Sequence, residues 1–479
     1  MTVTVIPVKF KARIVAKGFS QIEGTHFKET FSPTLKMQSL RLILAFTAHK
    51  DWALRQLDVK TAFLIPTLPE SETIYMTPPP TIDVPKGKAL KLKRCIYGLR
   101  QASRKFYEHM NATLRDMGLT ASTADYCMYT YVQNNDILAV LGLFVDDVVL
   151  AGDKQVLEKL AQSLMSRYKM TDAGTPNYLL GIAIDHDIAN GKVSLSQEAY
   201  CQRLLETYNM SNCKPAKTPA AVLRLTVGDS PITPAESAEM AAVPYRNAVG
   251  ALLYLYVATR PDIGFAVIQV AKFVSDPRPQ HWVACKRIFR YLKGTADLSI
   301  TYHKDTEFEV NAWSDSDWGG DLDTRRSTSG YVVTVKTKFG FSPISWRCKL
   351  QRLVALSSCE SELISLVDSM KETLWMIKIL GDLGFTHITP LCVYEDNQGC
   401  IAIATNQRGM SSRTKHVETR YFAVRQHIEN NTIRVVYMET TKMLADILTK
   451  ATPVQTFVYL RSRLGLTPLK PVFHMLDPL

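Results

Sequence analysis

The sequence of 479 residues has no apolar run of the roughly 20 residues that a membrane-spanning helix needs. Its longest apolar runs, at 137–145 and 248–258, are far too short, and the first ten residues show no secretory signal. Cysteine is also sparse. Nine cysteines are scattered between Cys95 and Cys400 without a single CxxC pair, which excludes a disulfide framework and a zinc ribbon. We therefore expect an intracellular protein that is not secreted and has no membrane partner.

Acidic residues are scarce near the N-terminus, where residues 1–115 carry 19 Lys and Arg but only 8 Asp and Glu. This segment accounts for most of the formal net charge of +12. Between Val84 and Tyr107 there are eight basic residues, several aromatic ones and no acid. Such a stretch suits phosphate neutralisation and base stacking, although a solvated basic face has the same composition. The candidate nucleic-acid contacts in this stretch are Lys91, Lys93, Arg94, Arg104 and Lys105.

The remaining composition, 46% hydrophobic and 21% charged, is that of a globular chain, and its length suggests two or three domains. Residues 211–240 are rich in proline and have no sustained period, which indicates a tether. The pattern at 245–293 predicts two or three helices. Beyond it we expect strands at 308–313, 331–336, 344–346, 391–394 and 433–438, and helices at 359–380, from Gln398 and at 419–429.

Two acidic residues, Asp146 and Asp147, lie between apolar runs that are typical of buried strands. This pattern predicts a hairpin with carboxylates at its tip, although a tight turn alone would also use such residues. Asp58 ends a second apolar strand within 52–64, before an expected helix that it would also be suited to cap. If these strand ends meet at one edge of a sheet, the three carboxylates suit a site for divalent cations and substrate phosphates.

A second set of acids occurs in the C-terminal part, in the order strand Asp315, helix Glu362, strand-end Asp396 and helical Asp446. Singly, helix capping or the helix dipole would account for each of the last three. We place Glu362 in the first turn of its helix and prefer it to Glu360, because the apolar helical pattern follows from it. Asp317 is the alternative to Asp315.

Ordered blocks of this sequence resemble the reverse transcriptase and ribonuclease H (RNase H) of copia-type retrotransposons. The reverse transcriptase blocks are KARIVAKG at 11–18, ETFSP at 29–33, LDVKTAFL at 57–64, YGLRQA at 97–102 and FVDD at 144–147. The RNase H blocks are WSDSDW at 313–318, RRSTSGY at 325–331, ISW at 344–346, ALSSCESE at 355–362, DNQ at 396–398, RTKH at 413–416 and LADILTK at 444–450. Between them, YRNAVGALLY at 245–254, TRPDI at 259–263 and YLKGT at 291–295 resemble the family's connector.

The resemblance implies that Asp58, Asp146 and Asp147 are the catalytic, metal-binding acids of a polymerase palm. It places Lys11, Arg13 and Lys17 on fingers strands near the incoming nucleotide, and Gly98 and Gln101 in support of the template or nucleotide pocket. It also implies that four acids bind metal in an RNase H fold and activate water: Asp315, Glu362, Asp396 and Asp446. The basic residues Arg413, Lys415 and His416 would contact substrate phosphates, unless they form a plain surface turn.

The predicted fold is therefore α/β and α+β multidomain. It comprises palm and fingers with an antiparallel sheet and helices, a helical thumb or connection, and an RNase H-like mixed sheet with helices. The predicted domains are 1–210 (palm and N-terminally truncated fingers), 211–305 (tether and thumb or connection), 306–452 (RNase H-like) and 453–479 (C-terminal tail).

The function that the resemblance implies is RNA-directed DNA polymerase with RNase H activity, using two Mg²⁺ or Mn²⁺ ions in each site. Its partners would be an RNA template, a DNA primer, an RNA–DNA hybrid, dNTPs and other parts of the polyprotein. If the chain is part of a live element, its location would be a cytoplasmic virus-like particle. Two alternatives remain open. One is a catalytically inactive remnant that binds nucleic acid, which the truncated fingers favour, and the other is a hydrolase with RNase H activity alone.

Overall fold

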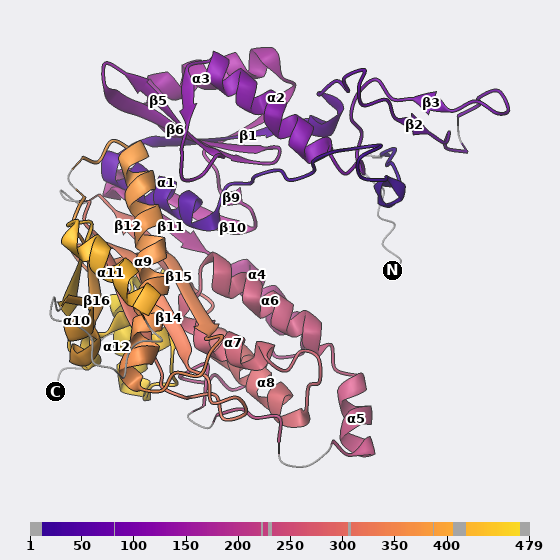
Figure 1. The fold of residues 1–479 in the computed structure, drawn as a ribbon. Helices are drawn as coiled ribbons and strands as arrows, with labels where there is room; N and C mark the ends of the chain where they lie inside the picture. Colours follow the sequence, from indigo (N-terminus) through magenta and orange to yellow (C-terminus); the bar gives the residue numbers. More distant parts are fainter. Residues whose placement is uncertain are drawn as a thin grey trace. The chain divides into compact units, whose positions relative to one another are not determined.

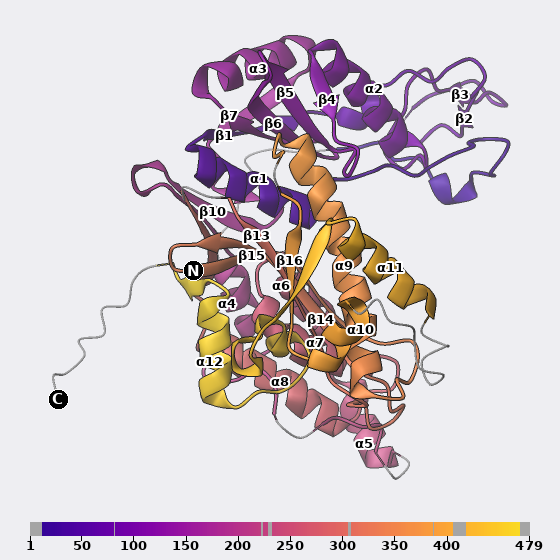
Figure 2. The same ribbon diagram turned by 60° about the vertical axis from the view of Figure 1, so that its left-hand side comes forward.

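The computed structural model describes residues 12–80, 82–221, 224–228, 232–304, 308–386, 388–405 and 418–469. The chain divides into two compact units, which Figures 1 and 2 show from two sides. The first unit comprises Met1–Ser39 and Ala53–Thr175, and the second comprises Leu40–Trp52 and Pro176–Leu479. The predicted domains, 1–210, 211–305, 306–452 and 453–479, stay predictions.

The first unit is built on a six-stranded antiparallel sheet in the order β4-β5-β6-β7-β1-β8. Its strands are β1 (Ala53–Val59), β4 (Leu119–Ala121), β5 (Met128–Gln133), β6 (Asp136–Phe144), β7 (Asp147–Gly152) and β8 (Met170–Gly174). The helices α2 (Ala102–Asp116) and α3 (Lys154–Arg167) cover one face of this sheet (Figure 1). In α2 the buried residues Phe106, Met110 and Leu114 recur every fourth position, which gives the helix one apolar stripe facing the core.

Short elements complete the first unit: η1 (Gly18–Ser20), η2 (Ala62–Leu64), and the strand pair β2 (Tyr75–Met76) and β3 (Leu90–Lys91). The helix that we expected after Asp58 is only the single 3₁₀ turn η2. Thr61, just before it, has a left-handed backbone with φ of 56°. A right-handed helix cannot pass through such a residue, so the chain turns sharply below the end of β1.

The second unit contains an antiparallel sheet in the order β18-β12-β11-β10-β9. Its strands are β9 (Tyr178–Leu179), β10 (Ile182–Asp187), β11 (Lys192–Ser196), β12 (Leu298–His303) and β18 (Leu466–Pro468). The helical and 3₁₀ segments near it in sequence are η3 (Ile188–Asn190), α4 (Glu198–Thr207), α5 (Pro234–Ala241), α6 (Tyr245–Ala258), η4 (Pro261–Ile263), α7 (Gly264–Ala271) and α8 (Pro279–Lys293).

The helices predicted at 245–293 are confirmed as α6, α7 and α8. The tether predicted at 211–240 is wrong at its end, because α5 begins there at Pro234. Thr233 caps α5, and its side chain and that of Glu236 bind each other's backbone N–H groups. This capping box, with proline at the first helical position, is a helix-start signal in the sequence.

A five-stranded mixed sheet forms the C-terminal part of the second unit, in the order β15-β14-β13-β16-β17. The strands are β13 (Val310–Ser316), β14 (Thr328–Thr337), β15 (Gly340–Leu350), β16 (Leu391–Glu395) and β17 (Ile433–Tyr437). Pairs β13–β14 and β14–β15 are antiparallel, whereas β13–β16 and β16–β17 are parallel. The predicted mixed sheet is therefore confirmed.

Helix α9 (Ser358–Asp382) runs along this sheet and packs on β13 and β14 (Figure 2). The other helical segments are α1 (Met37–Lys50), α10 (Gln398–Thr405), α11 (Glu418–Glu429), η6 (Thr440–Lys442), η7 (Leu444–Leu448) and α12 (Val454–Arg463). Strand β13 is buried on both faces, which requires cover from both sides. In the described ranges, no helix has the length and apolar character needed to cross a bilayer.

Candidate functional site

The first candidate site is the group that we call the hairpin acids: Asp58, Asp146 and Asp147. Asp58 on β1 pairs directly with Asp147 on β7, so their side chains point to the same face of the sheet. Asp146 lies in the two-residue turn between β6 and β7, and its carbonyl accepts the N–H of Val59 at 2.9 Å. The predicted hairpin with carboxylates at its tip is therefore present.

The electrostatic environment of Asp146 and Asp147 disfavours their charged forms. Burial, with smaller contributions from neighbouring acids, raises the pKa of both Asp146 and Asp147. The Gln56 amide opposes this for Asp147 by donating a hydrogen bond of 3.3 Å to Oδ1. A cation at this tip would relieve the repulsion among half-buried carboxylates.

Among the residues expected around the incoming nucleotide, the backbone at Gly98 packs closely against the backbone at Ala16. Gly98 has a positive φ of 88°, and a Cβ atom there would lie 2.2 Å from the carbonyl oxygen of Ala16. Arg13 places its guanidinium over the Tyr97 ring at 5.6 Å. Gln101 is buried and donates to the His26 carbonyl at 3.0 Å, so its amide holds the loop together. Lys17 immediately precedes η1, and Lys11 lies outside the described residues.

The five basic residues proposed to contact nucleic acid fall into two classes. Lys91, Lys93 and Arg94 are exposed. Arg104 instead pairs with Glu29 and Glu108, and Lys105 lies 2.7 Å from Glu72. Only the first class presents its charges without acidic partners in the described part of the chain.

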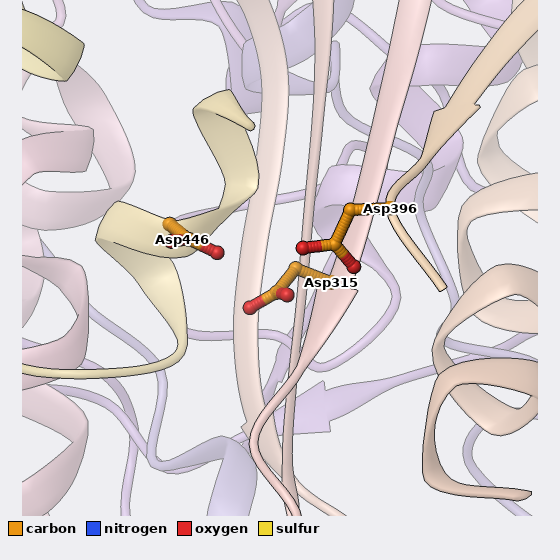
Figure 3. Close-up of side chains that lie close together, drawn as sticks. All are labelled: Asp315, Asp396 and Asp446. Atoms are coloured by element: carbon orange, nitrogen blue, oxygen red, sulfur yellow. The ribbon is translucent and has the colours of Figure 1, made fainter. Parts of the chain in front are cut away.

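The second candidate site, which we call the buried acid cluster, comprises Asp315, Glu362, Glu395, Asp396 and Asp446. Among the described residues, two groups of acids have oxygen atoms within 4.8 Å of one another. One joins Asp315, Asp396 and Asp446, which Figure 3 shows converging from a strand, a strand end and a helical turn. The other joins Glu362, Glu395 and Asp396. The hairpin acids, which are all described, form no such group.

Local packing brings these distant segments together. Gly330 on β14 lies opposite Asp315 in the strand ladder. A Cβ atom at Gly330 would lie 2.6 Å from Thr449 Cγ2, so the absence of a side chain lets the chain following η7 approach the sheet. The Thr449 hydroxyl donates a hydrogen bond to Asp315 Oδ2. On α9, the Ser365 hydroxyl donates to the Asp315 carbonyl at 2.7 Å.

Lys450 places a cation at the cluster, and it was not among the site residues predicted from the sequence. Its Nζ lies 2.8 Å from Asp446 Oδ1 and 3.7 Å from Asp315 Oδ2. The residues Asp446 and Lys450 are four positions apart, which is the spacing of side-chain pairs in a helix. That spacing is the signal that would have identified Lys450.

Glu395 is a member of this cluster that was not predicted from the sequence. The residues Leu391, Val393 and Glu395 are the buried positions of β16, so the carboxylate continues an otherwise apolar row. Glu395 is 0% exposed, and neither its Oε2 nor Oε2 of Glu362 has a hydrogen-bond partner in the described residues. The alternation along β16 would have shown that an acid at this position faces inward.

The two alternative acids, Asp317 for Asp315 and Glu360 for Glu362, each have other binding partners in the structure. Asp317 is in neither group, because it binds Arg224 at 2.9 Å and the Thr328 N–H; burial raises its pKa to about 6. Glu360 occupies the first turn of α9, where it accepts the N–H of Leu356 at 2.7 Å. Glu362 was expected in the first turn, but α9 begins at Ser358, which puts Glu362 in the second turn. The helix dipole therefore does not explain why an acid occupies this buried position.

Burial is the main cause of the electrostatic strain in the cluster. It raises the pKa of Asp446 to about 8, and it raises the pKa values of Glu362, Glu395 and Asp396 above their ordinary values. Burial alone would lower the pKa of Lys450, but Asp315 and Asp446 raise it. An all-oxygen ligand set with unpartnered buried oxygens fits hard divalent cations such as Mg²⁺ or Mn²⁺. Arg413, Lys415 and His416, expected near the substrate phosphates, lie outside the described residues.

The family model and the curated relatives that match this chain point to the same family. The model for "Reverse transcriptase (RNA-dependent DNA polymerase)" matches residues 3–222. The "Retrovirus-related Pol polyprotein from transposon TNT 1-94" of Nicotiana tabacum is 38% identical over 96% of this chain, and the corresponding RE1 polyprotein of Arabidopsis thaliana is 36% identical over 97%. The matches cover 34% and 31% of those relatives, so the chain spans about a third of their length.

Two solved structures align with parts of the chain at low scores. An N-terminal RNase H domain from Mycobacterium tuberculosis, fused to maltose-binding protein, covers 33% of this chain and 98% of that one, with 9% identity and a TM-score of 0.24. The LC11-RNase H1 structure with an RNA/DNA hybrid covers 29% of this chain and 94% of that one, with 10% identity and a TM-score of 0.23.

Proposed function

Because the chain belongs to the copia-type retrotransposon Pol family, we propose that it copies RNA into DNA and hydrolyses the RNA strand of the resulting hybrid. The observation that carries the hydrolytic half is the convergence of Asp315, Asp396 and Asp446. Burial makes gathered carboxylates unfavourable without a compensating charge. Their convergence is therefore best explained by a function that uses it.

In the hydrolytic site, two Mg²⁺ or Mn²⁺ ions held by Asp315, Glu362, Asp396 and Asp446 would supply charge stabilisation and activation of water. The chain's own contribution is to orient the carboxylates. Thr449 fixes Asp315 by a hydrogen bond, and Lys450 balances part of the negative charge. The substrate would be an RNA phosphodiester in an RNA–DNA hybrid.

In the polymerase site, the hairpin acids would hold two ions of the same kind, which would supply stabilisation of phosphoryl transfer. The primer 3′ hydroxyl would lose its proton and attack the α-phosphate of the dNTP, breaking the bond to the β-phosphate and releasing pyrophosphate. The Gly98 and Gln101 region would shape the pocket for template and nucleotide, with Arg13 and Lys17 beside it. Exposed Lys91, Lys93 and Arg94 would neutralise backbone phosphates.

The test uses the full chain with Mg²⁺ in two separate assays, primer extension on an RNA template and cleavage of labelled RNA in a hybrid. Asp146→Asn should abolish extension and leave cleavage intact, and Asp396→Asn should do the reverse. Equal loss of both activities in both variants would contradict the two-site proposal. Binding of hybrid without either activity would select the inactive remnant.

A second candidate function is hydrolysis alone. It is favoured by the contrast between the two sites, because the buried acid cluster has closely spaced oxygens and the hairpin acids form no such group among the described residues. Cleavage of the hybrid by wild-type protein that never extends a primer would select this alternative.

A further inference from the structure

The strongest unassigned feature is the carboxylate of Glu395 at the end of β16. Asp396 follows it directly, but only Asp396 belongs to the acid pattern expected of the family. Glu395 Oε1 accepts the backbone N–H of Asn397 at 3.2 Å. Its Oε2 is buried and has no hydrogen-bond partner among the described residues. A charged oxygen in this position needs compensation.

The surroundings of this oxygen are acidic. Oxygen atoms of Glu362, Glu395 and Asp396 lie within 4.8 Å of one another, and Oε2 of Glu362 is also unpartnered among the described residues. In the described ranges, no Lys or Arg forms an ion pair with Glu362 or Glu395, whereas Asp315 and Asp446 share Lys450. Carboxyl groups without a basic ion-pair partner therefore gather at Glu362 and Glu395, whereas Lys450 pairs with Asp315 and Asp446.

The geometry points to Glu395 as a ligand of a divalent cation, which it holds together with Glu362 and Asp396. Mg²⁺ binds oxygen at about 2.1 Å, so opposite ligands lie about 4.2 Å apart. The spacing observed here needs only small side-chain movements to reach that value. The site lies beside the one formed by Asp315, Asp396 and Asp446, and Asp396 belongs to both. The inference therefore deepens the proposed hydrolytic function, and it adds a fifth acid to that centre.

The experiment counts bound Mn²⁺ on the chelator-stripped full chain, using the electron paramagnetic resonance signal of free Mn²⁺. Glu395→Gln keeps the shape of the side chain but removes its charge. We expect it to weaken one Mn²⁺ site by at least about tenfold, because outer-shell partners alone are worth 10–100-fold. The matched control is Glu360→Gln, on the same helix as Glu362 but outside the cluster, and it should bind Mn²⁺ as the wild type does. Any Mn²⁺ ions bound at the hairpin acids contribute equally to every variant, so they drop out when the Mn²⁺ counts of two variants are compared.

A second variant keeps the test decisive if Glu395→Gln fails to fold. Asp446→Asn leaves the group of Glu362, Glu395 and Asp396 intact and should still bind an ion there. The number of Mn²⁺ ions bound by this variant should therefore fall by one relative to wild type and no further. Loss of every Mn²⁺ ion attributable to the cluster in Asp446→Asn would overturn the inference, as would unchanged Mn²⁺ binding in folded Glu395→Gln.

The hybrid-cleavage assay separates this result from the proposed function. Wild-type protein that binds Mn²⁺ through Glu395 but does not cleave the hybrid would overturn the hydrolytic proposal and leave the cation site standing. Protein that cleaves the hybrid, with Mn²⁺ binding insensitive to Glu395→Gln, would overturn the cation site and leave the hydrolytic proposal standing.

Discussion

The Nζ atom of Lys450 lies 2.8 Å from Oδ1 of Asp446, so a cation from the chain itself occupies one side of the buried acid cluster. The same ammonium lies 3.7 Å from Asp315. A divalent cation bound between these carboxylates would compete with the ammonium for the same negative charge. Lys450 is therefore expected to stabilise the metal-free chain and to weaken its affinity for metal.

This competition can be measured with Lys450→Met. In EDTA the free energy of unfolding should fall by about 1–3 kcal/mol, less than the ~3–5 kcal/mol of a fully buried pair, because the Lys450 side chain is 34% exposed. In Mg²⁺ the deficit should shrink, since the divalent cation replaces the lost charge. Urea unfolding under both conditions tests this, with Lys450→Arg as the charge-preserving control. An equal deficit in EDTA and in Mg²⁺ would contradict the competition.

Gly330 should be required for hydrolysis although it has no chemical group of its own. In Gly330→Ala the new Cβ would push against Thr449, displacing the segment that carries Asp446. Such overpacking costs about 1–3 kcal/mol of unfolding free energy, and a displacement of about 1 Å at a catalytic group reduces the rate by about 100-fold. Primer extension should be unaffected.

The matched control is Gly250→Ala in α6, where a Cβ atom meets nothing within 4 Å. That change should be neutral or raise the unfolding free energy by about 0.5–1 kcal/mol. Hybrid cleavage by Gly330→Ala at the wild-type rate would show that the close approach of Thr449 to the sheet is unimportant.

His281 should make the second unit sensitive to mild acid. The ring stacks on Phe273 with centroids 3.7 Å apart, Nδ1 accepts the Arg278 N–H, and Nε2 lies 2.9 Å from the Thr226 carbonyl. This arrangement needs Nδ1 unprotonated, and burial lowers the pKa of His281. The unfolded chain therefore takes up the proton first, so stability falls as pH drops below about 6.5, by up to about 1.4 kcal/mol per unit.

The measurement is urea unfolding at pH 7.5 and pH 5.5 for wild type and His281→Gln. The variant should be less stable at pH 7.5, and the difference should narrow at pH 5.5 because glutamine takes up no proton. A difference that stays constant between the two pH values would show that His281 does not titrate in this range.

The predictable part of the candidate site was its residue types, and the unpredicted part was its contacts. Asp315, Asp396 and Asp446 stand in motifs that the sequence shows directly, and their oxygen atoms lie within 4.8 Å of one another. Their role as metal ligands stays a prediction. Glu395 and Lys450 were missed. A local signal existed for each, the alternation along β16 and the four-residue spacing from Asp446. Their proximity to Glu362 and Asp315, respectively, has no such local signal, because those residues are distant in sequence.

The fold shows the same division. Strands β13 to β17 were expected near their observed positions, because alternating apolar residues are a local signal. The parallel pairing of β13 with β16 depends on the crossover through α9 and is not local. The helix expected after Asp58 failed for a local reason, the left-handed backbone of Thr61, which no apolar period reveals.

The last prediction separates the two classes of basic residues near the N-terminus. Lys91 and Lys93 are exposed, and if they neutralise phosphates as proposed, replacing both with alanine should leave those phosphates without a partner. The slope of log K against log salt concentration should become shallower by about 0.7–0.9 for each phosphate no longer neutralised. Fluorescence anisotropy with labelled RNA–DNA hybrid between 50 and 200 mM salt, conditions in which such slopes are about linear, measures this.

The comparison variant replaces Arg104 and Lys105, whose charges are held by Glu29, Glu108 and Glu72. Removing them should lower the free energy of unfolding by about 1 kcal/mol, the upper range for partly exposed ion pairs. It should change the salt slope less, because these charges are already neutralised within the chain. A larger change of slope for the Arg104 and Lys105 variant would mean that nucleic acid displaces the glutamates, and it would contradict the assignment of Lys91 and Lys93 as the principal contacts.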